Sequence, residues 1–346
     1  MRTIKIKFVD FYTGFVPDNF LFYKLLSETY DVALSDTPDY VFFSVFGNEH
    51  LKYNGVKIFY TGENQSPDFN VCDYAIGFDY LQYGDRYLRF PYYYMNFAMF
   101  DLMRRKSDFS PDNSASKTGF CSFVYSNNNA SPERKLFFDL LSAYKPVASG
   151  GRLMNNIGGA VHDKLAFQKN YKFAIAFENS SSPGYTTEKL IHAFASQTIP
   201  IYWGDPTVGT WFNTESFVNC HDFRSFEEVV ERVKALDQDD SAYLRMMQTP
   251  ALCGMENDYA DTVKNLQSFL NNIIEQPLDK AKRYNREYWG RKYINRQREL
   301  NKAYNRSLKG LSETLYMKCF RKIEQKKKSI LFWRIHKVLM KLAGKN

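Results

Sequence analysis

The strongest constraint on the fold is an alternation of strand-like and helix-like segments that occurs twice along the chain. In the first block, apolar runs predict strands at residues 3–9, 40–46, 56–60 and 74–78. An apolar stripe at helical spacing predicts a helix at residues 19–30. This alternation favours a mostly parallel sheet with helices on its faces.

A polar segment interrupts the alternation before it starts again. The segment KSDFSPDNSASK, residues 106–117, is rich in Ser, Asp and Asn and contains Pro111, which is typical of a linker. The second block predicts strands at 120–125, 173–177 and 198–203, and helices at 132–144, 188–196, 226–236 and 259–274. We therefore expect an α/β protein with two Rossmann-like domains facing a central cleft, where ligands commonly bind.

Charge indicates a third part of the chain. Residues 279–346 hold 21 Lys and Arg against 5 Asp and Glu, whereas the rest of the chain has a net negative charge. The sequence thus predicts an N-terminal domain at residues 1–112, a second domain at 113–278 and a basic helical tail at 279–346.

Cysteine usage indicates a reducing compartment. The five cysteines are odd in number and lack the paired spacing of a disulfide framework or a zinc site. The N-terminal residues MRTIKIKFVD lack the long apolar run of a signal peptide or a membrane anchor. A cytoplasmic location is therefore expected.

The densest polar cluster follows the predicted strand at residues 173–177. A loop of Ser, Pro and Gly leads to a helix that begins near Thr186 or Thr187. Free backbone N–H groups and the helix dipole at such a start favour a bound anion. Lys189 in the first turn is unfavourable for the helix alone, and a bound diphosphate would remove this conflict. From chemistry alone, Glu188 and Lys189 could equally be ordinary solvent-facing side chains.

The same stretch resembles the signature of the α1,3/4-fucosyltransferases of glycosyltransferase family ten. That signature has FEN, a short Ser/Gly loop, Tyr-x-Thr-Glu-Lys and Ile-Pro-Ile-x-x-Gly-x-Pro in this order, which correspond here to residues 177–179, 185–189 and 199–206. Two further segments are similar to the family, YTGENQSPDFN at residues 60–70 and SNNNASPERKLFFDLL at residues 126–141. The likeness covers roughly residues 56–275 and is to bacterial members, which lack a Golgi anchor and stem.

The resemblance implies a GT-B fold, with an acceptor-binding domain at residues 1–112 and a GDP-fucose-binding, nucleotide-binding domain at residues 113–278. It also implies an inverting transfer of L-fucose from GDP-β-L-fucose to an N-acetyllactosamine-type acceptor, β-galactosyl-GlcNAc. It favours an α1,3 linkage to GlcNAc, as in a Lewis x product, while transfer to the 4-hydroxyl stays open. The mechanism requires no cofactor, although stimulation by a divalent cation also stays open.

The resemblance assigns the catalytic base to Glu63. An inverting transfer needs a base for the acceptor proton, together with cations or hydrogen-bond donors for the departing diphosphate. Glu63 follows the predicted strand at residues 56–60 in the turn Thr61-Gly62-Glu63-Asn64. From the residues alone, a Glu at a strand end could instead accept hydrogen bonds from the turn.

Two cations are expected to hold the diphosphate. By family match these are Arg134, near the start of a predicted helix, and Lys189. The mixed-sign run Glu133-Arg134-Lys135 could also be an ordinary surface segment.

Four more residues are expected at the sugar-nucleotide site. Tyr185 is expected to contact the phosphates and Glu188 the ribose hydroxyls. Asn179 is expected to fix the loop or bind the sugar nucleotide, and Glu178 to interact with the fucose.

A metal site is not predicted. Asp237-Gln238-Asp239 has the DxD spacing, but its place at the end of a surface-type helix indicates solvated charges. His192 is expected to be a structural contact, since the histidines lie far apart in sequence.

The tail is expected to bind an anionic membrane surface. In SILFWRIHKVLMKLAGK, residues 329–345, Arg334, Lys337 and Lys341 share one helical face and apolar residues share the other. The apolar run is shorter than the ~20 residues that span a bilayer, so the helix would lie in the interface. This predicts peripheral attachment to the cytoplasmic face of the inner membrane and no nucleic-acid binding; a helix folded back onto the body is the alternative.

Two other functions stay open. The chain could be a GT-B glycosyltransferase that uses another sugar nucleotide, or an inactive homologue that binds glycans. The joint presence of Glu63, Arg134 and Lys189 argues against the inactive homologue.

Overall fold

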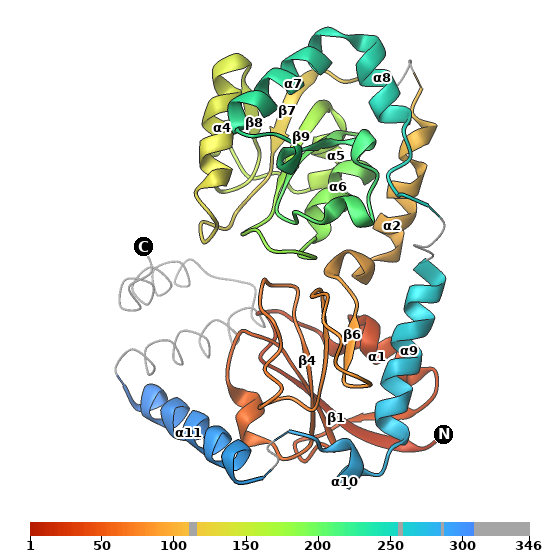
Figure 1. Cartoon of the computed structure of the whole chain (residues 1–346), viewed down its shortest axis with the longest axis vertical. Coiled ribbons are helices and arrows are strands. Elements are labelled where there is room, and N and C mark those ends of the chain that lie inside the picture. The colour runs from red at the N-terminus through yellow and green to blue at the C-terminus, as the bar shows by residue number, and fades with distance from the viewer. Residues whose placement is uncertain (111–115, 255–258, 285–286, 308–346) are drawn as a thin grey trace. The chain divides into compact units, whose positions relative to one another are not determined.

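The computed structural model describes residues 1–110, 116–254, 259–284 and 287–307 (Figure 1). Contacts divide the chain into two compact units: the first has residues 1–76, 83–88 and those from 267 on, and the second has 77–82 and 89–266. This grouping differs from the three ranges expected from the sequence. Residues 89–110 belong to the second unit, and the end of the predicted nucleotide-binding domain belongs to the first.

The first unit contains a six-stranded sheet in the order β2-β1-β3-β4-β5-β6. The strands are β1 Thr3–Val9, β2 Asp31–Leu34, β3 Tyr40–Phe43, β4 Val56–Tyr60, β5 Tyr74–Gly77 and β6 Tyr87–Arg89. The pairings from β2 to β5 are parallel. β3, β4 and β5 are buried along their whole length, as expected for central strands of a parallel sheet.

Helices complete the first unit. The predicted helix at residues 19–30 is shorter in the structure, where a 3-10 turn at Pro17–Asn19 precedes α1 Leu21–Ser27. α9 Tyr259–Glu275 contributes residues to both units. α10 Leu278–Ala281 and α11 Glu287–Arg306 follow it.

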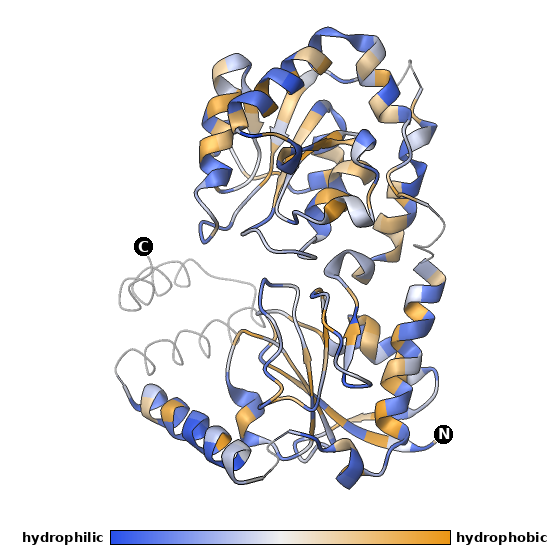
Figure 2. Cartoon of the chain, in the orientation of Figure 1, coloured by the Kyte–Doolittle hydropathy of each residue, from blue (hydrophilic) through white to orange (hydrophobic). Residues whose placement is uncertain are grey.

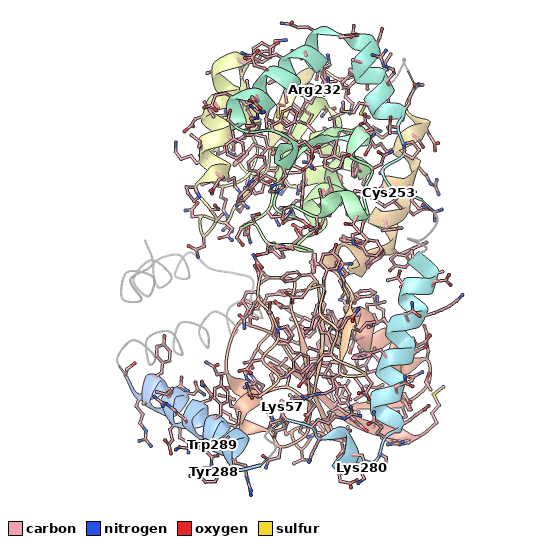
Figure 3. The ribbon with its side chains drawn as sticks, viewed as in Figure 1. Lys57, Arg232, Cys253, Lys280, Tyr288 and Trp289 are labelled. Atoms are coloured by element: carbon pink, nitrogen blue, oxygen red, sulfur yellow. The ribbon has the colours of Figure 1, made fainter. Side chains whose placement is uncertain are left out.

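A buried carboxylate fastens the start of the basic segment to the first unit. Asp73 accepts hydrogen bonds from the backbone N–H groups of Lys57 (2.7 Å), Tyr284 (2.6 Å) and Arg283. The Lys57 ammonium, which Figure 3 labels, donates to the Tyr284 hydroxyl (2.7 Å). We call these four residues the Asp73 latch. Ala281 of α10 and Ile294 of α11 are buried, and Tyr284 packs against the same core cluster as Ile294.

The second unit contains a parallel five-stranded sheet in the order β11-β10-β9-β7-β8. Its strands are β7 Gly119–Phe123, β8 Val147–Ser149, β9 Tyr171–Phe177, β10 Ile199–Trp203 and β11 Val218–Asn219. Its helices are α2 Phe97–Arg104, α4 Glu133–Tyr144, α5 Lys164–Lys169, α6 Glu188–Ala195, α7 Phe226–Gln238 and α8 Asp240–Gln248. Figure 2 shows hydrophobic and hydrophilic positions side by side on α4 and α7, as in helices that cover a sheet.

The segment before the predicted linker is held in the second unit by a buried lysine. α2 contacts α6 and buries Phe100 and Met103. Just after α2, the fully buried ammonium of Lys106 donates to the carbonyls of Met246 (2.5 Å) and Thr249 (3.0 Å). These contacts explain why residues 89–110 do not remain with the first sheet.

Within the described residues, no helix has the length and apolarity needed to cross a membrane. Cys72, Cys121, Cys220 and Cys253 are free thiols. The fifth cysteine, Cys319, and the predicted membrane-binding helix at residues 329–345 lie outside the described residues.

Candidate active site

The loop after β9 and the start of α6 are joined by a buried carboxylate. Glu178 is fully buried and accepts hydrogen bonds from the backbone N–H and the hydroxyl of Thr187, each at 2.7 Å. Thr187 occupies the N-cap position, but its own side chain makes no capping hydrogen bond. Glu178 therefore takes the place of a side-chain cap from Thr187, and its two oxygens fix the N-terminal end of α6.

Lys189 lies against two carboxylates in the first turn of α6. Its ammonium is 3.0 Å from Glu178 Oε2 and 3.3 Å from Glu188 Oε1, and it donates to Thr187 Oγ1 at 2.8 Å. Burial opposes the charge, but the two carboxylates outweigh burial and raise the pKa of Lys189 above its usual value. These ion pairs explain how the helix tolerates a cation at its N-terminus.

Glu188 is the more accessible member of this cluster, with 35% of its side chain exposed. Burial disfavours its ionised form, yet Lys189, Lys164 and His192 outweigh burial and lower the pKa of Glu188 to about 2. Glu188 is therefore an ionised acceptor for hydroxyl groups at neutral pH.

Arg134 is a buried residue of the same site, not a surface charge. It is 2% exposed in the first turn of α4. Its Nη2 donates to Asn179 Oδ1 (2.8 Å) and to the Phe177 carbonyl (3.2 Å), and its guanidinium lies 4.1 Å from the centre of the Tyr125 ring. Its buried Nε has no hydrogen-bond partner among the described residues. Arg134 is therefore not an ordinary surface charge within the run Glu133-Arg134-Lys135.

Tyr185 lies in the loop that leads to α6. Its ring is 2% exposed, packs at 5.1 Å against Phe78, and its hydroxyl contributes to the charged environment of Lys189. The loop needs glycine at position 184, where φ is +81° and a Cβ would lie 2.6 Å from the Phe78 carbonyl oxygen.

Sequence reasoning missed two residues of this site. Lys164 is the first residue of α5. Its pKa is lowered to about 8, mainly by burial and further by the nearby cations Lys189 and Arg134. The carboxylates Glu188 and Glu178 raise the pKa of Lys164 and so partly oppose this shift. Asp205 is buried and holds the loop by accepting from Gly184 N–H (2.8 Å). Asp205 occupies the variable position of the Gly-x-Pro motif, so the motif could have indicated it. No motif or spacing in the sequence indicated Lys164.

His192 lies half-buried in the middle of α6. Partial burial and the nearby cation Lys164 lower its pKa to about 4, so the ring is neutral at neutral pH. Its Nδ1 has no hydrogen-bond partner among the described residues.

Glu63 lies in the first unit, directly after β4. Its backbone N–H donates to Thr61 Oγ1 (3.0 Å), and its carbonyl accepts from Gln65 N–H (2.8 Å). The structure therefore groups Arg134, Glu178, Asn179, Tyr185, Glu188 and Lys189 in the second unit and places Glu63 on a turn of the first.

Within the described ranges, no group of three His, Cys, Asp or Glu side chains could hold a metal ion. The expectation that Asp237 is solvated was wrong. Only 4% of its side chain is exposed, and it pairs with Lys145 and with Lys172 (3.3 Å). Asp239 caps α8 by accepting from Ala242 N–H (3.0 Å). Both carboxylates therefore have structural roles.

Comparisons with known proteins identify the family. Residues 6–96 match the model of the α-(1,3)-fucosyltransferase FucT N-terminal domain, and residues 114–265 match that of the glycosyltransferase family 10 (fucosyltransferase) C-terminal part. A crystal structure of an α1,3-fucosyltransferase is 34% identical, has a TM-score of 0.69, and is matched over 91% of its length and 80% of this chain. The chain belongs to the family 10 fucosyltransferases.

Other relatives agree with this membership. The α-(1,3)-fucosyltransferase FucT of Helicobacter pylori is 38% identical over 74% of this chain, which spans 62% of that protein's length. A putative fucosyltransferase of Acanthamoeba polyphaga mimivirus is 29% identical over 66% of this chain and 38% of its own length. A crystal structure of α1,3-fucosyltransferase with GDP-fucose has a TM-score of 0.67, at 34% identity over 80% of this chain and 93% of its own.

These findings confirm the family resemblance and the α/β fold class. The two parallel, Rossmann-like sheets are those of the GT-B type that this fucosyltransferase family implies.

Proposed function

We propose that this chain is an inverting fucosyltransferase that moves L-fucose from GDP-β-L-fucose to the GlcNAc of N-acetyllactosamine-type acceptors. The observation that carries the proposal is a pair of cations beside the loop after β9, in a chain of this family. They are the buried Arg134 in the first turn of α4 and the largely buried Lys189 in the first turn of α6, and we call them the cation cluster. Such a group suits the diphosphate of a sugar nucleotide.

The cations act on the departing group. As the bond between the anomeric carbon and the diphosphate oxygen breaks, negative charge grows on the diphosphate. Arg134 and Lys189 stabilise that charge from fixed positions, so little reorganisation is needed during the reaction. Tyr185 completes the phosphate contacts, and the ionised Glu188 accepts hydrogen bonds from the ribose hydroxyls.

Glu63 acts on the acceptor. Its carboxylate takes the proton of the acceptor hydroxyl while that oxygen attacks the anomeric carbon on the face opposite the diphosphate. The new glycosidic bond therefore has the inverted configuration. The favoured product is the α1,3-linked, Lewis x type.

The proposal also covers where the protein acts and whether it needs a metal. The basic tail attaches the protein to anionic lipid on the cytoplasmic face of the inner membrane, near lipid-linked glycans. The reaction uses charges supplied by the protein and proceeds without a bound metal, with stimulation by divalent cations as a secondary effect.

A donor panel tests the proposal directly. The full chain is incubated with GDP-fucose, GDP-mannose or UDP-sugars and with type 1 or type 2 disaccharides, and nucleotide release and product linkage are measured. Release with GDP-fucose and a 3-linked fucose on the type 2 acceptor is expected. Turnover of another sugar nucleotide would instead indicate a different GT-B transferase, and glycan binding without turnover would indicate an inactive homologue.

A further inference from the structure

A cavity lies within the first unit. It has a volume of about 320 Å³, and its walls come from the carboxyl ends of β3 and β4, the loop after β4, and α11. This volume is at the lower end of the range for ligand sites. The lining combines rings and uncharged polar groups with one carboxylate: Phe43, His50, Gln65, Asp68, Tyr293 and Gln297.

The histidine in this cavity is held in one orientation. His50 Nδ1 donates to Asp10 Oδ2 at 2.7 Å, and Asp10 also accepts from the backbone N–H groups of Glu49 (2.8 Å) and His50 (2.9 Å). Gly47 makes room for this carboxylate, since a Cβ there would lie 2.4 Å from Asp10 Oδ1. With Nδ1 as the donor, a neutral His50 has Nε2 as an acceptor for a ligand hydroxyl.

Aromatic rings also line the wall of this cavity. Phe43 stacks on His50 with ring centres 4.1 Å apart and an angle of 20°. Tyr293 of α11 donates its hydroxyl to Asp68 at 2.7 Å, which holds the helix against the loop after β4. Ring faces beside hydroxyl-binding groups suit a sugar, which has apolar C–H faces and polar edges.

The charge of this cavity differs from that of the cation cluster. No Lys or Arg belongs to its described lining, which has Asp68 instead. Asp68 accepts hydrogen bonds from Asn70 and Tyr293 but has no cation beside it in this lining. An anionic ligand such as a nucleotide would be repelled by this carboxylate, whereas a neutral polyhydroxyl ligand could donate a hydrogen bond to it.

The cavity also shares a loop with the proposed base. Gln65, which lines it, donates its backbone N–H to the carbonyl of Glu63 at 2.8 Å. We propose that this cavity binds a neutral sugar ring of the acceptor glycan and so brings the acceptor to the turn that carries Glu63. The inference rests on the proposed function, and it makes α11 part of the acceptor site.

Substitutions in the cavity test this inference in the full-length protein. Gln297→Ala and His50→Ala are each expected to raise the KM for N-acetyllactosamine by about three- to tenfold, as expected for lost hydrogen bonds. The KM for GDP-fucose is expected to change by less than about twofold. Arg296→Ala on α11 and Glu49→Ala beside His50 are matched controls, because neither side chain lines the cavity.

A binding measurement separates failure of this inference from failure of the proposed function. Saturation-transfer NMR with N-acetyllactosamine is expected to show contact with the wild type and a strongly reduced signal with Gln297→Ala. Binding without transfer would refute the proposed function alone. An unchanged signal and acceptor KM in Gln297→Ala and Gln65→Ala, or no signal with the wild type, would overturn the acceptor site. Because both Gln side chains are replaceable polar groups at the cavity wall, the test does not depend on the folding of His50→Ala.

Discussion

At the scale of single residues, the site depends on charges that compensate one another. Glu178 is fully buried, and Lys189 is its cation at 3.0 Å. Removing one member of a buried pair leaves an uncompensated charge, which typically costs ~3–5 kcal/mol of stability. A loss of activity in Lys189→Ala would therefore mix effects on phosphate binding with effects on folding, and the double variant Glu178→Gln/Lys189→Met is the better comparison.

Glu63→Gln is expected to lower turnover by about 10²- to 10⁴-fold while the affinity for GDP stays within about twofold, because only the proton acceptor is removed. Single-turnover kinetics and calorimetry with GDP measure the two quantities. Glu49→Gln, an exposed carboxylate of the same unit, is the control. Lost GDP affinity in Glu63→Gln would show that Glu63 is a ligand of the nucleotide or a structural residue.

Lys164→Met is expected to weaken GDP binding by about three- to tenfold, because one cation of the phosphate environment is removed. It is also expected to raise the pKa of His192 from its value of about 4, since Lys164 helps to lower it. NMR titration of the ring gives this second measurement independently of activity. Lys169→Met at the other end of α5 is the control, and an unshifted His192 would contradict the placement of Lys164.

At the scale of elements, the loop before α6 depends on backbone geometry. Gly184→Ala introduces a Cβ at a φ of +81° and 2.6 Å from a carbonyl oxygen. The strain is expected to cost ~1–3 kcal/mol and to reduce GDP affinity at least about tenfold. Thermal unfolding and GDP titration measure these effects. Gly254→Ala, where an added Cβ meets open space, is expected to be neutral.

Lys106 predicts a pH dependence for the contact between the α2 region and the end of α8. Burial lowers its pKa to about 7, below the usual 10.5 of the unfolded chain. Between pH 7 and 10.5 the unfolded state binds more protons, so this lysine makes the protein more stable as pH rises, by at most ~1.4 kcal/mol per pH unit. Below pH 7 both states are protonated and the dependence disappears.

Urea unfolding of the second unit between pH 6 and 10 measures this effect. The difference in unfolding free energy between the wild type and Lys106→Met is expected to shift in favour of the wild type with rising pH. A difference that stays constant over this range would mean that the ammonium keeps an ordinary pKa in the folded protein.

The elements show where sequence reasoning works. The strands β3, β4, β9 and β10 were predicted within a few residues, because strands buried on both faces have continuous apolar runs. The strands β2, β6 and β8 were missed, since each is short and has partly exposed positions. The grouping of residues 89–110 with the second unit was also missed, because α2 packs on α6 and the buried Lys106 binds carbonyls that lie far along the chain.

The candidate site was likewise predicted only in part from the sequence. A motif located Arg134, Glu178, Tyr185, Glu188 and Lys189, and the structure brings them together. The motif did not reveal that Glu178 accepts hydrogen bonds from Thr187, and the DxD spacing did not reveal that Asp237 pairs with two lysines. Contacts between residues that are separated in sequence leave no local pattern.

At the scale of the whole molecule, the basic segment at residues 279–346 divides into residues 279–307 and residues 308–346, which lie outside the described residues. The former include α11, whose first turn carries the exposed Tyr288 and Trp289 labelled in Figure 3. Deleting residues 329–346 is expected to move the protein from anionic vesicles to the soluble fraction and to leave transfer to soluble acceptors within about twofold. Co-sedimentation with anionic and neutral vesicles measures this, and vesicle binding that survives the deletion would assign attachment to residues 1–328.

The Asp73 latch has a consequence for how the protein is made. The carboxylate of Asp73 belongs to the early part of the chain, but its partners Arg283 and Tyr284 are translated more than two hundred residues later. The strands of the first sheet are therefore synthesised before Arg283 and Tyr284, which bind Asp73. The second unit can complete its folding while the first unit still lacks these contacts. A nascent chain halted before residue 284 should thus protect its second unit from protease and leave its first unit open to cleavage.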